Sequence, residues 1–261
     1  MKNTAQFVES IVPGRYSGKR IFLTGAGSGI GKAVAIRLAA EGGNVYCVDL
    51  KGAQETVASI VASGGTATAA DLDVTDAAAV EASVEAAAAA MGGIDIVCNI
   101  AGIGHFAWSH EETPEWFDRI VKVNLNGSFY VIRYALPHLL ATGNGVVVNT
   151  ASNSGLMGAP WSAAYCASKG GVVQLTRELA IEYRNKGVRA VAVAPGGTNT
   201  NIINSFMTLP EGADFKDMAR IMTPIPTAEP EELAATFAFV ASDEARYMTG
   251  AIVSVDGGLA C

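Results

Sequence analysis

Several features that mark particular classes of protein are missing from this 261-residue sequence. It contains no run of lysine or arginine and has a formal net charge of −7, so nucleic acid or an anionic membrane is not expected as a partner. No CxxC pair occurs, and no histidine stands near a cysteine at ligand spacing. We therefore expect neither a metal site nor a disulfide framework. The cysteines are scattered: Cys47, Cys98, Cys166 and Cys261.

The sequence also lacks a long hydrophobic run. Its longest apolar stretch, residues 94–108, is interrupted by polar side chains and is too short to cross a bilayer. No apolar segment follows Lys2, so we expect no secretory signal and a cytoplasmic location.

Hydrophobic residues make up 50% of the chain, charged residues only 16%, and glycine is abundant at 29 residues. That composition supports a large buried core with close packing of helices on a sheet. Short apolar runs typical of strands alternate with longer helical patterns. The expected strands are Arg20–Thr24, Asn44–Asp49, Thr66–Ala70, Ile94–Cys98, Gly145–Thr150, Val188–Ala194 and Ala251–Val255. The expected helices are Gly29–Glu41, Gly52–Ala62, Asp76–Met91, Pro114–Leu140, Ala163–Lys186 and Glu229–Ala241.

This alternation predicts an α/β fold, a single doubly wound (Rossmann) domain. A mostly parallel seven-stranded sheet would have helices on both faces, because continuous apolar strands must be buried on both sides. No linker divides residues 19–261, and residues 1–18 form an N-terminal extension. The irregular, proline-containing stretch at about 198–228 is long for a loop inside a compact domain, which favours a substrate lid.

A glycine cluster closes the first expected strand and opens the first helix, at Thr24-Gly25-Ala26-Gly27-Ser28-Gly29-Ile30-Gly31. Glycines there allow a tight turn and let backbone N–H groups approach a pyrophosphate at the positive end of the helix. Asp49 ends the second strand, where a carboxylate can accept hydrogen bonds from a ribose 2′-hydroxyl and would repel a 2′-phosphate. Lys32 and Lys51 lie nearby and can soften that preference. The pattern therefore favours NAD(H).

Tyr165 and Lys169 stand four residues apart on an expected helix, so both project from one face. A phenol has a pKa of about 10, and a nearby cation can lower it by about 1–3 units. Tyr165 can then exchange a proton with an alcohol while hydride leaves for the cofactor. Ser152, at a strand end, can hold the substrate oxygen near the phenol.

These motifs together resemble the short-chain dehydrogenase/reductase family, over about Lys19 to Gly258. The family's TGxxxGxG turn matches residues 24–31, and its acidic adenine-side segment matches residues 71–74. Its NNAG segment matches residues 99–102 with Ile100 replacing the second asparagine. Ser152 and the YxxxK pair follow, then the PGxxxT segment at 195–200, where Thr198 replaces an aliphatic residue.

The resemblance implies a catalytic tetrad of Asn124, Ser152, Tyr165 and Lys169. Tyr165 would be the acid/base, Lys169 would lower its pKa and bind the nicotinamide ribose, and Asn124 would hold a water in a proton relay. Thr200 would contact the nicotinamide carboxamide. The expected cofactor-binding residues are Gly25, Gly27, Ser28, Gly29, Ile30, Gly31, Asp49, Leu50, Asp73, Val74, Asn99, Ala101, Gly102, Tyr165, Lys169, Pro195, Gly196, Thr198 and Thr200. The resemblance also implies a homotetramer, assembled through the two long helices.

The substrate pocket is expected above the nicotinamide, at the carboxyl ends of the strands. Its expected wall is mostly apolar, which favours a lipophilic or cyclic secondary alcohol or ketone. The first candidates are His105, Asn153, Ser154, Trp161, Ile202 and Phe206. Further wall and lid candidates are Gly104, Phe106, Leu156, Ile203, Met207 and Leu209.

Other functions remain open at this stage. A 3-oxoacyl-thioester reductase would share the tetrad, although Asp49 and the acidic balance disfavour it. A sugar dehydrogenase is not excluded. A dinucleotide-sensing protein without catalysis is a further alternative, because fold does not fix function, but it would not need all four tetrad residues.

Overall fold

The computed structural model describes residues 7–206, 208–223 and 225–260. Seven parallel strands form one sheet in the order β3-β2-β1-β4-β5-β6-β7. This confirms the doubly wound fold and makes the sheet parallel throughout. The strands are β1 (Arg20–Thr24), β2 (Asn44–Asp49), β3 (Thr66–Asp71), β4 (Ile96–Asn99), β5 (Gly145–Thr150), β6 (Val188–Pro195) and β7 (Ile252–Val255).

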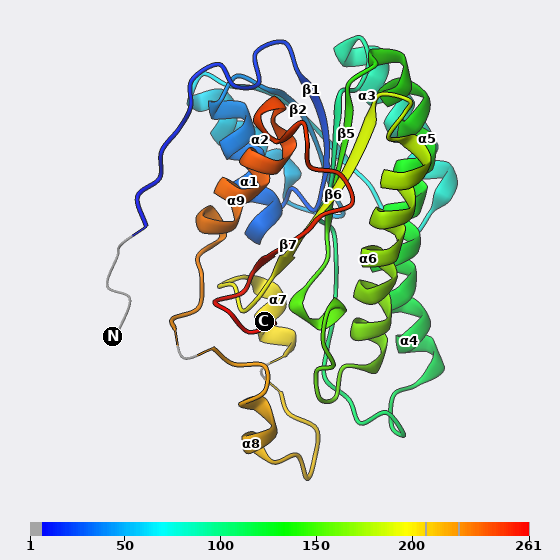
Figure 1. Ribbon diagram of the computed structural model, residues 1–261, viewed down its shortest axis with the longest axis vertical. Coiled ribbons are helices and arrows are strands. Elements are labelled where there is room, and N and C mark those ends of the chain that lie inside the picture. The colour runs from blue at the N-terminus through cyan, green and yellow to red at the C-terminus, as the bar shows by residue number, and fades with distance from the viewer. Residues whose placement is uncertain (1–6, 207, 224, 261) are drawn as a thin grey trace.

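Helices cover both faces of the sheet (Figure 1). Helices α1 (Gly29–Ala40), α2 (Ala53–Ala62) and α9 (Pro230–Ala241) lie on one face. On the other face lie α3 (Ala77–Met91), α4 (Pro114–Val121), α5 (Gly127–Thr142) and α6 (Ala163–Tyr183). Each layer buries its own apolar cluster against the sheet, which accounts for the fully buried β6 and for β5, buried except at Thr150. We expected every strand to be buried on both faces. The two edge strands, β3 and β7, are more exposed than that, because each has only one neighbouring strand.

Local signals fix the ends of several helices. The Asp76 carboxylate accepts hydrogen bonds from the N–H groups of Ala78 and Ala79 at the start of α3, and Gly92 ends that helix in a left-handed conformation. Pro230 opens α9, where Glu229 and Glu232 form a capping box. These caps explain why the observed helices begin and end within a few residues of the sequence expectation.

The predicted single helix Pro114–Leu140 is wrong in one respect. A π-helical turn, η1 (Lys122–Asn126), separates α4 from α5. Such turns are rare and occur often at functional sites, and their apolar periodicity is hard to distinguish from that of an α-helix. Asn124 lies within this turn.

The expected lid is not wholly irregular. Two short helices, α7 (Asn201–Ser205) and α8 (Phe215–Met218), lie within it. An isolated parallel bridge joins Thr198 to Ala228 and closes the segment at its base. In Figure 1 the part containing α8 projects beyond the carboxyl end of the sheet. Met207, one of the lid candidates, lies outside the described residues.

The described part of the N-terminal extension is tied to the domain by buried polar contacts. The fully buried Glu41 carboxylate lies 3.3 Å from Arg15 and 2.6 Å from Arg37, and accepts the N–H of Val12. The Tyr16 hydroxyl donates to the carbonyl of Ala238 on α9. Residues 12–17 are therefore integrated into the layer formed by α1 and α9.

Within the described ranges, we find no helix with the length and apolar character needed to cross a membrane.

Candidate active site

The glycine turn between β1 and α1 is packed too closely for side chains. A Cβ atom on Gly31 would lie 1.9 Å from the carbonyl oxygen of Gly25, and one on Gly27 would lie 2.0 Å from the carbonyl of Lys51. Gly25 and Gly29 also have φ angles of 75° and 53°, which favour glycine. This leaves the N-terminal N–H groups of the 12-residue helix α1 beside glycines that carry no side chain, a geometry suited to a pyrophosphate.

Asp49 lies beside that turn, as the sequence predicted. Its carboxylate accepts hydrogen bonds from the N–H of Gly27 at 2.9 Å and of Lys51 at 3.3 Å. These bonds leave acceptor capacity on both oxygens. The next residue, Leu50, is 62% exposed despite being apolar. A carboxylate with an exposed apolar neighbour fits a ribose with an adenine ring.

The ends of β1 and β4 are joined by Thr24, whose hydroxyl accepts the N–H groups of Ile100 and Ala101. Thr200 approaches the turn from the lid, since its Cγ2 would lie 3.0 Å from a Cβ on Gly29. The structure therefore brings the glycine turn, the segment after β4 and the start of the lid together. Their residues could hold a dinucleotide at the carboxyl end of the sheet.

The remaining expected cofactor residues lie near the same edge. Asp73 accepts the N–H of Thr75, and the buried Val74 packs on Gly127. The Thr198 hydroxyl donates to the carbonyl of Gly196, which follows Pro195 at the end of β6.

Asn99 has a structural role that the sequence analysis did not assign. Its amide nitrogen donates to the Asn149 side chain at 2.9 Å and to the carbonyl of Ser128 at 3.4 Å. Asn149 in turn donates to Thr176 on α6. The Asn99 side chain thus ties β4 to β5 and to the helices behind them.

Tyr165 and Ser152 meet at the end of β5. The Ser152 hydroxyl donates to Asn153 at 3.0 Å and accepts the N–H of Ser154, which fixes its position. Burial raises the pKa of Tyr165 to about 12, and a hydrogen bond with Ser152 acts in the opposite direction.

Lys169 is buried, with its side-chain nitrogen 5.8 Å from the centre of the Tyr165 ring. The ammonium group donates to the carbonyl of Thr150 at 2.7 Å. Burial lowers the pKa of Lys169 to about 8. Burial of the phenol is the largest influence on its pKa, and the lowering by Lys169 expected from the sequence stays a prediction.

Asn124 braces the segment after β4 against α6. Its amide nitrogen donates to the carbonyl of Ile103 at 2.9 Å and to the hydroxyl of Ser168 at 3.0 Å, and its Oδ1 accepts the N–H of Ile103 at 2.8 Å. A Cβ on Gly102 would lie 3.3 Å from the Asn124 Oδ1 and 3.5 Å from the Lys169 nitrogen. Asn124 is therefore close to Lys169, while its role in holding a water stays a prediction.

An aromatic wall stands over the tyrosine. The Phe206 ring meets that of Tyr165 edge-on at 5.2 Å and also contacts Phe106 at 4.9 Å. Phe106 packs in turn on Trp161 at 5.6 Å. Trp161 has a φ of 56°, unusual for a bulky residue, and its carbonyl accepts the N–H of Ala107. The lid and the loop after β5 thus form one apolar surface.

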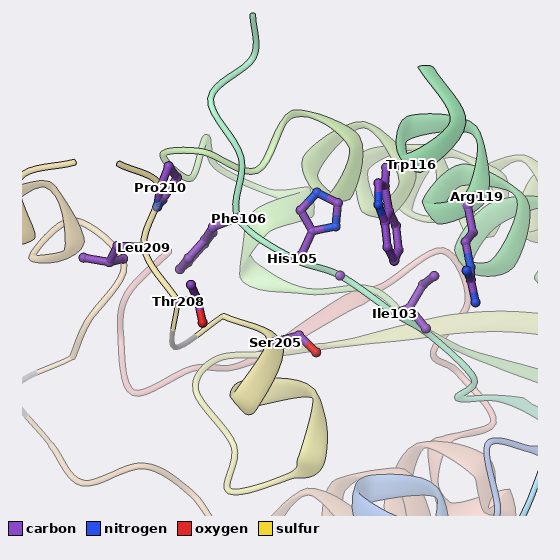
Figure 2. Close-up of a pocket in the computed structure, with 10 residues that line it drawn as sticks. Ile103, His105, Phe106, Trp116, Arg119, Ser205, Thr208, Leu209 and Pro210 are labelled. Carbon is purple, nitrogen blue, oxygen red and sulfur yellow. The ribbon is translucent and has the colours of Figure 1, made fainter. Parts of the chain in front are cut away.

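A cavity of about 460 Å³ adjoins this wall (Figure 2). Gly104 connects the cavity to the aromatic wall, since it lines the cavity and a Cβ on it would contact Phe206 and Tyr165. The cavity is lined by Ile103, Gly104, His105, Phe106, Trp116, Arg119, Ser205, Thr208, Leu209 and Pro210.

Only some of the expected substrate residues line that cavity. His105 does, and Phe206 and Trp161 belong to the aromatic wall beside it. Asn153 and Ser154 lie at Ser152 instead, and Ile202 is not part of the lining. Sequence reasoning missed Trp116 and Arg119, because nothing in the helical pattern of α4 indicated that its first turns reach the pocket.

These residues can perform proton exchange beside a bound dinucleotide. The phenol supplies the exchangeable proton, Ser152 can hold an oxygen next to it, and Lys169 provides a buried cation. The glycine turn and Asp49 fit the diphosphate and the adenosine ribose of such a cofactor.

Comparisons with known proteins agree with this arrangement. A family model described as "Enoyl-(Acyl carrier protein) reductase" matches residues 25–260. Meso-2,3-butanediol dehydrogenase of Serratia marcescens is 44% identical, with 94% of this chain and 95% of that protein aligned. Cyclohexanol dehydrogenase of Acinetobacter sp. (strain SE19) is 38% identical, with 96% and 98% aligned.

Among solved structures, 3-ketoacyl-(acyl-carrier-protein) reductase from Brucella melitensis, complexed with NADH, is 36% identical. It superposes with a TM-score of 0.85 over 94% of this chain and 99% of that one.

Proposed function

The chain belongs to the short-chain dehydrogenase/reductase family and is an oxidoreductase that acts on CH–OH groups, and from that premise we propose that it interconverts a lipophilic or cyclic secondary alcohol and its ketone with NAD(H). The observation that carries the proposal is the cluster of Tyr165, Ser152 and the buried Lys169 beside the glycine turn.

In the oxidation, Ser152 holds the substrate hydroxyl and Tyr165, as the phenolate, takes its proton. The dinucleotide, when bound, would supply the hydride acceptor. The Lys169 ammonium favours phenolate, which opposes the effect of burial on the Tyr165 pKa. In the reduction, Tyr165 returns the proton to the carbonyl oxygen.

The substrate class is inferred from the aromatic wall. Phe206 contacts the Tyr165 ring, and Phe106 and Trp161 continue the aromatic wall away from the phenol. Relatives named for cyclohexanol and butanediol support a small secondary alcohol. Phosphorylated sugars fit this wall poorly.

The choice of NAD(H) over NADP(H) depends on Asp49. Its carboxylate, held by the N–H of Gly27, would face a 2′-phosphate with like charge. The related reductase complexed with NADH supports the same cofactor. Loss of the Asp49 charge should therefore improve use of NADPH.

The homotetramer implied by the family resemblance is part of the proposal. Apolar side chains are exposed on the helices expected to form the contact, including Phe117 on α4, Phe129 on α5 and Ile181 on α6. The cytoplasmic location expected from the sequence stays a prediction.

The test is a steady-state survey with NAD⁺ and NADP⁺ on cyclohexanol, butane-2,3-diol, a 3-hydroxysteroid and a sugar, and with the reduced cofactors on a 3-oxoacyl thioester. We expect turnover of the cyclic or small secondary alcohols with NAD⁺ preferred, and a smaller preference in Asp49→Ser. A clear NADP⁺ preference in the unmodified protein would contradict the cofactor assignment. Highest efficiency on the thioester would favour the second candidate, which the related 3-ketoacyl-(acyl-carrier-protein) reductase from Brucella melitensis suggests.

A further inference from the structure

The end of the cavity formed by α4 differs from the aromatic wall. There, Trp116 lies between two nitrogen-bearing side chains (Figure 2). The His105 ring meets the Trp116 ring edge-on at 4.9 Å, and the Arg119 guanidinium lies 5.1 Å from the centre of the same ring. All three line the cavity.

Arg119 is the one residue with a permanent charge in that lining. In the described part of the chain, no carboxylate lies within 4 Å of its guanidinium. Its contact with Trp116 orients the guanidinium but does not neutralise it. An uncompensated cation beside an apolar cavity has capacity for an anionic ligand.

The acidic group in contact with the cavity residue His105 is already engaged. Glu112 Oε1 lies 3.1 Å from His105 Nε2, and the Glu112 side chain is only 5% exposed. Glu111, Glu115 and Asp118 on the same segment are exposed and do not line the cavity. Water and salt screen these exposed carboxylates, and they also screen Arg119, which is itself exposed on the same helix. These carboxylates therefore do not occupy the place of a ligand.

Hydroxyl groups complete the polar lining. Ser205 and Thr208 reach the cavity from the lid. Each can donate one hydrogen bond to an oxygen atom. The cavity therefore combines a guanidinium with two hydroxyl donors, while Ile103, Phe106 and Leu209 supply its apolar surface.

We propose that the cavity between α4 and the lid is a subsite for a carboxylate carried by the substrate at a distance from the reacting carbon, with Arg119 as its recognition residue. The proposal rests on the proposed function and narrows its substrate class to cyclic keto or hydroxy acids. A planar guanidinium binds a carboxylate through two parallel hydrogen bonds, which adds specificity to charge attraction.

The position of the cavity fits this assignment. Gly104 borders both the cavity and the Tyr165 ring, so a ring seated against the aromatic wall can extend a substituent toward α4. The volume of about 460 Å³ lies within the range of small-molecule sites, about 300–1,000 Å³.

The first test measures binding without turnover. The dissociation constant of cyclohexanecarboxylate is measured by calorimetry on the full chain saturated with NADH, for the unmodified protein, Arg119→Gln and Arg133→Gln. Arg133 is the matched control, an exposed arginine whose guanidinium lies 5.6 Å from the centre of the Tyr134 ring and which does not line the cavity. We expect Arg119→Gln to weaken binding about tenfold or more, as befits the loss of a charged hydrogen-bonding partner, and Arg133→Gln to leave it unchanged. Equal binding in all three proteins, or no binding to any of them, overturns the proposal.

The second test compares 3-oxocyclohexanecarboxylate with cyclohexanone as substrates. The expected result is a lower KM for the acid in the unmodified protein, and loss of that preference in Arg119→Gln through KM. Turnover of cyclohexanone without any preference for the acid contradicts the carboxylate subsite but agrees with the proposed function. Failure to reduce either ketone, with carboxylate binding that still depends on Arg119, counts against the proposed function alone.

Discussion

Lys169 holds an ammonium group where water has little access. Among the described residues its hydrogen-bond acceptor is the Thr150 carbonyl, and burial lowers its pKa from 10.5 to about 8. The protein therefore bears an energetic penalty at this residue at neutral pH, on the order of 3 kcal/mol. The buried ammonium has a functional reason, since the same cation favours ionisation of the neighbouring Tyr165 phenol.

Lys169→Met should make the cofactor-free protein more stable at pH 7, by up to about 3 kcal/mol in the free energy of unfolding. The folded pKa lies below the unfolded value, so the unfolded chain binds more protons between pH 8 and 10.5, and the unmodified protein gains stability as pH rises through that window. The advantage of the variant should shrink over the same range. Urea unfolding at several pH values measures this, with the exposed Lys216→Met as control. A Lys169→Met variant less stable than the unmodified protein at pH 7 would contradict the claim that the buried ammonium destabilises the fold.

At the level of single residues, local spacing predicted much of the site. Tyr165 and Lys169 share a helix face because they are four residues apart, and Ser152 follows from the end of a strand. Arg119 and Trp116 could not be predicted in this way. Their place at the cavity depends on how α4 meets the lid, and the sequence gives no local sign of that packing.

Among the elements, the glycine turn is the most tightly constrained. Gly31→Ala would place a Cβ atom 1.9 Å from the Gly25 carbonyl oxygen, and a backbone atom cannot move away as a flexible side chain can. The turn must then shift and displace the N–H groups at the start of α1. We expect the dissociation constant of NADH to rise about tenfold or more.

Fluorescence titration with NADH measures that change. Gly158→Ala is the control, because a Cβ there meets no atom within 4 Å and its φ is not positive. Unaltered NADH affinity in Gly31→Ala would mean that the turn does not hold the dinucleotide.

The elements themselves were largely predictable, since apolar runs and caps located all seven strands within two residues. The exception is the helix interrupted by η1. Its side chains keep a nearly helical apolar period, and a π-helical turn depends on contacts such as those of Asn124 with Ile103 and Ser168. Such contacts come from tertiary structure, which a local pattern does not contain.

Over the whole molecule, the topology assembles the site from segments far apart in sequence. The sheet order places the ends of β1, β4, β5 and β6 side by side, so the glycine turn, Asn99–Ile103, Ser152 and Pro195–Thr200 share one edge. The alternating pattern predicted parallel strands with crossover helices, but not the order in which the strands pair. The N-terminal residues 12–17 pack into the layer of α1 and α9 through Glu41, which ends α1 far from the glycine turn, and through Tyr16, an attachment that no motif indicated.

The central claim is that the phenol of Tyr165 exchanges the proton while hydride is transferred. Its most direct test is the single-turnover rate of NADH formation from cyclohexanol in Tyr165→Phe, with NADH affinity measured on the same samples. We predict a rate lower by about 10²–10⁴-fold, as expected when a general acid/base is removed, and nearly unchanged NADH binding. A rate close to that of the unmodified protein would contradict the mechanism.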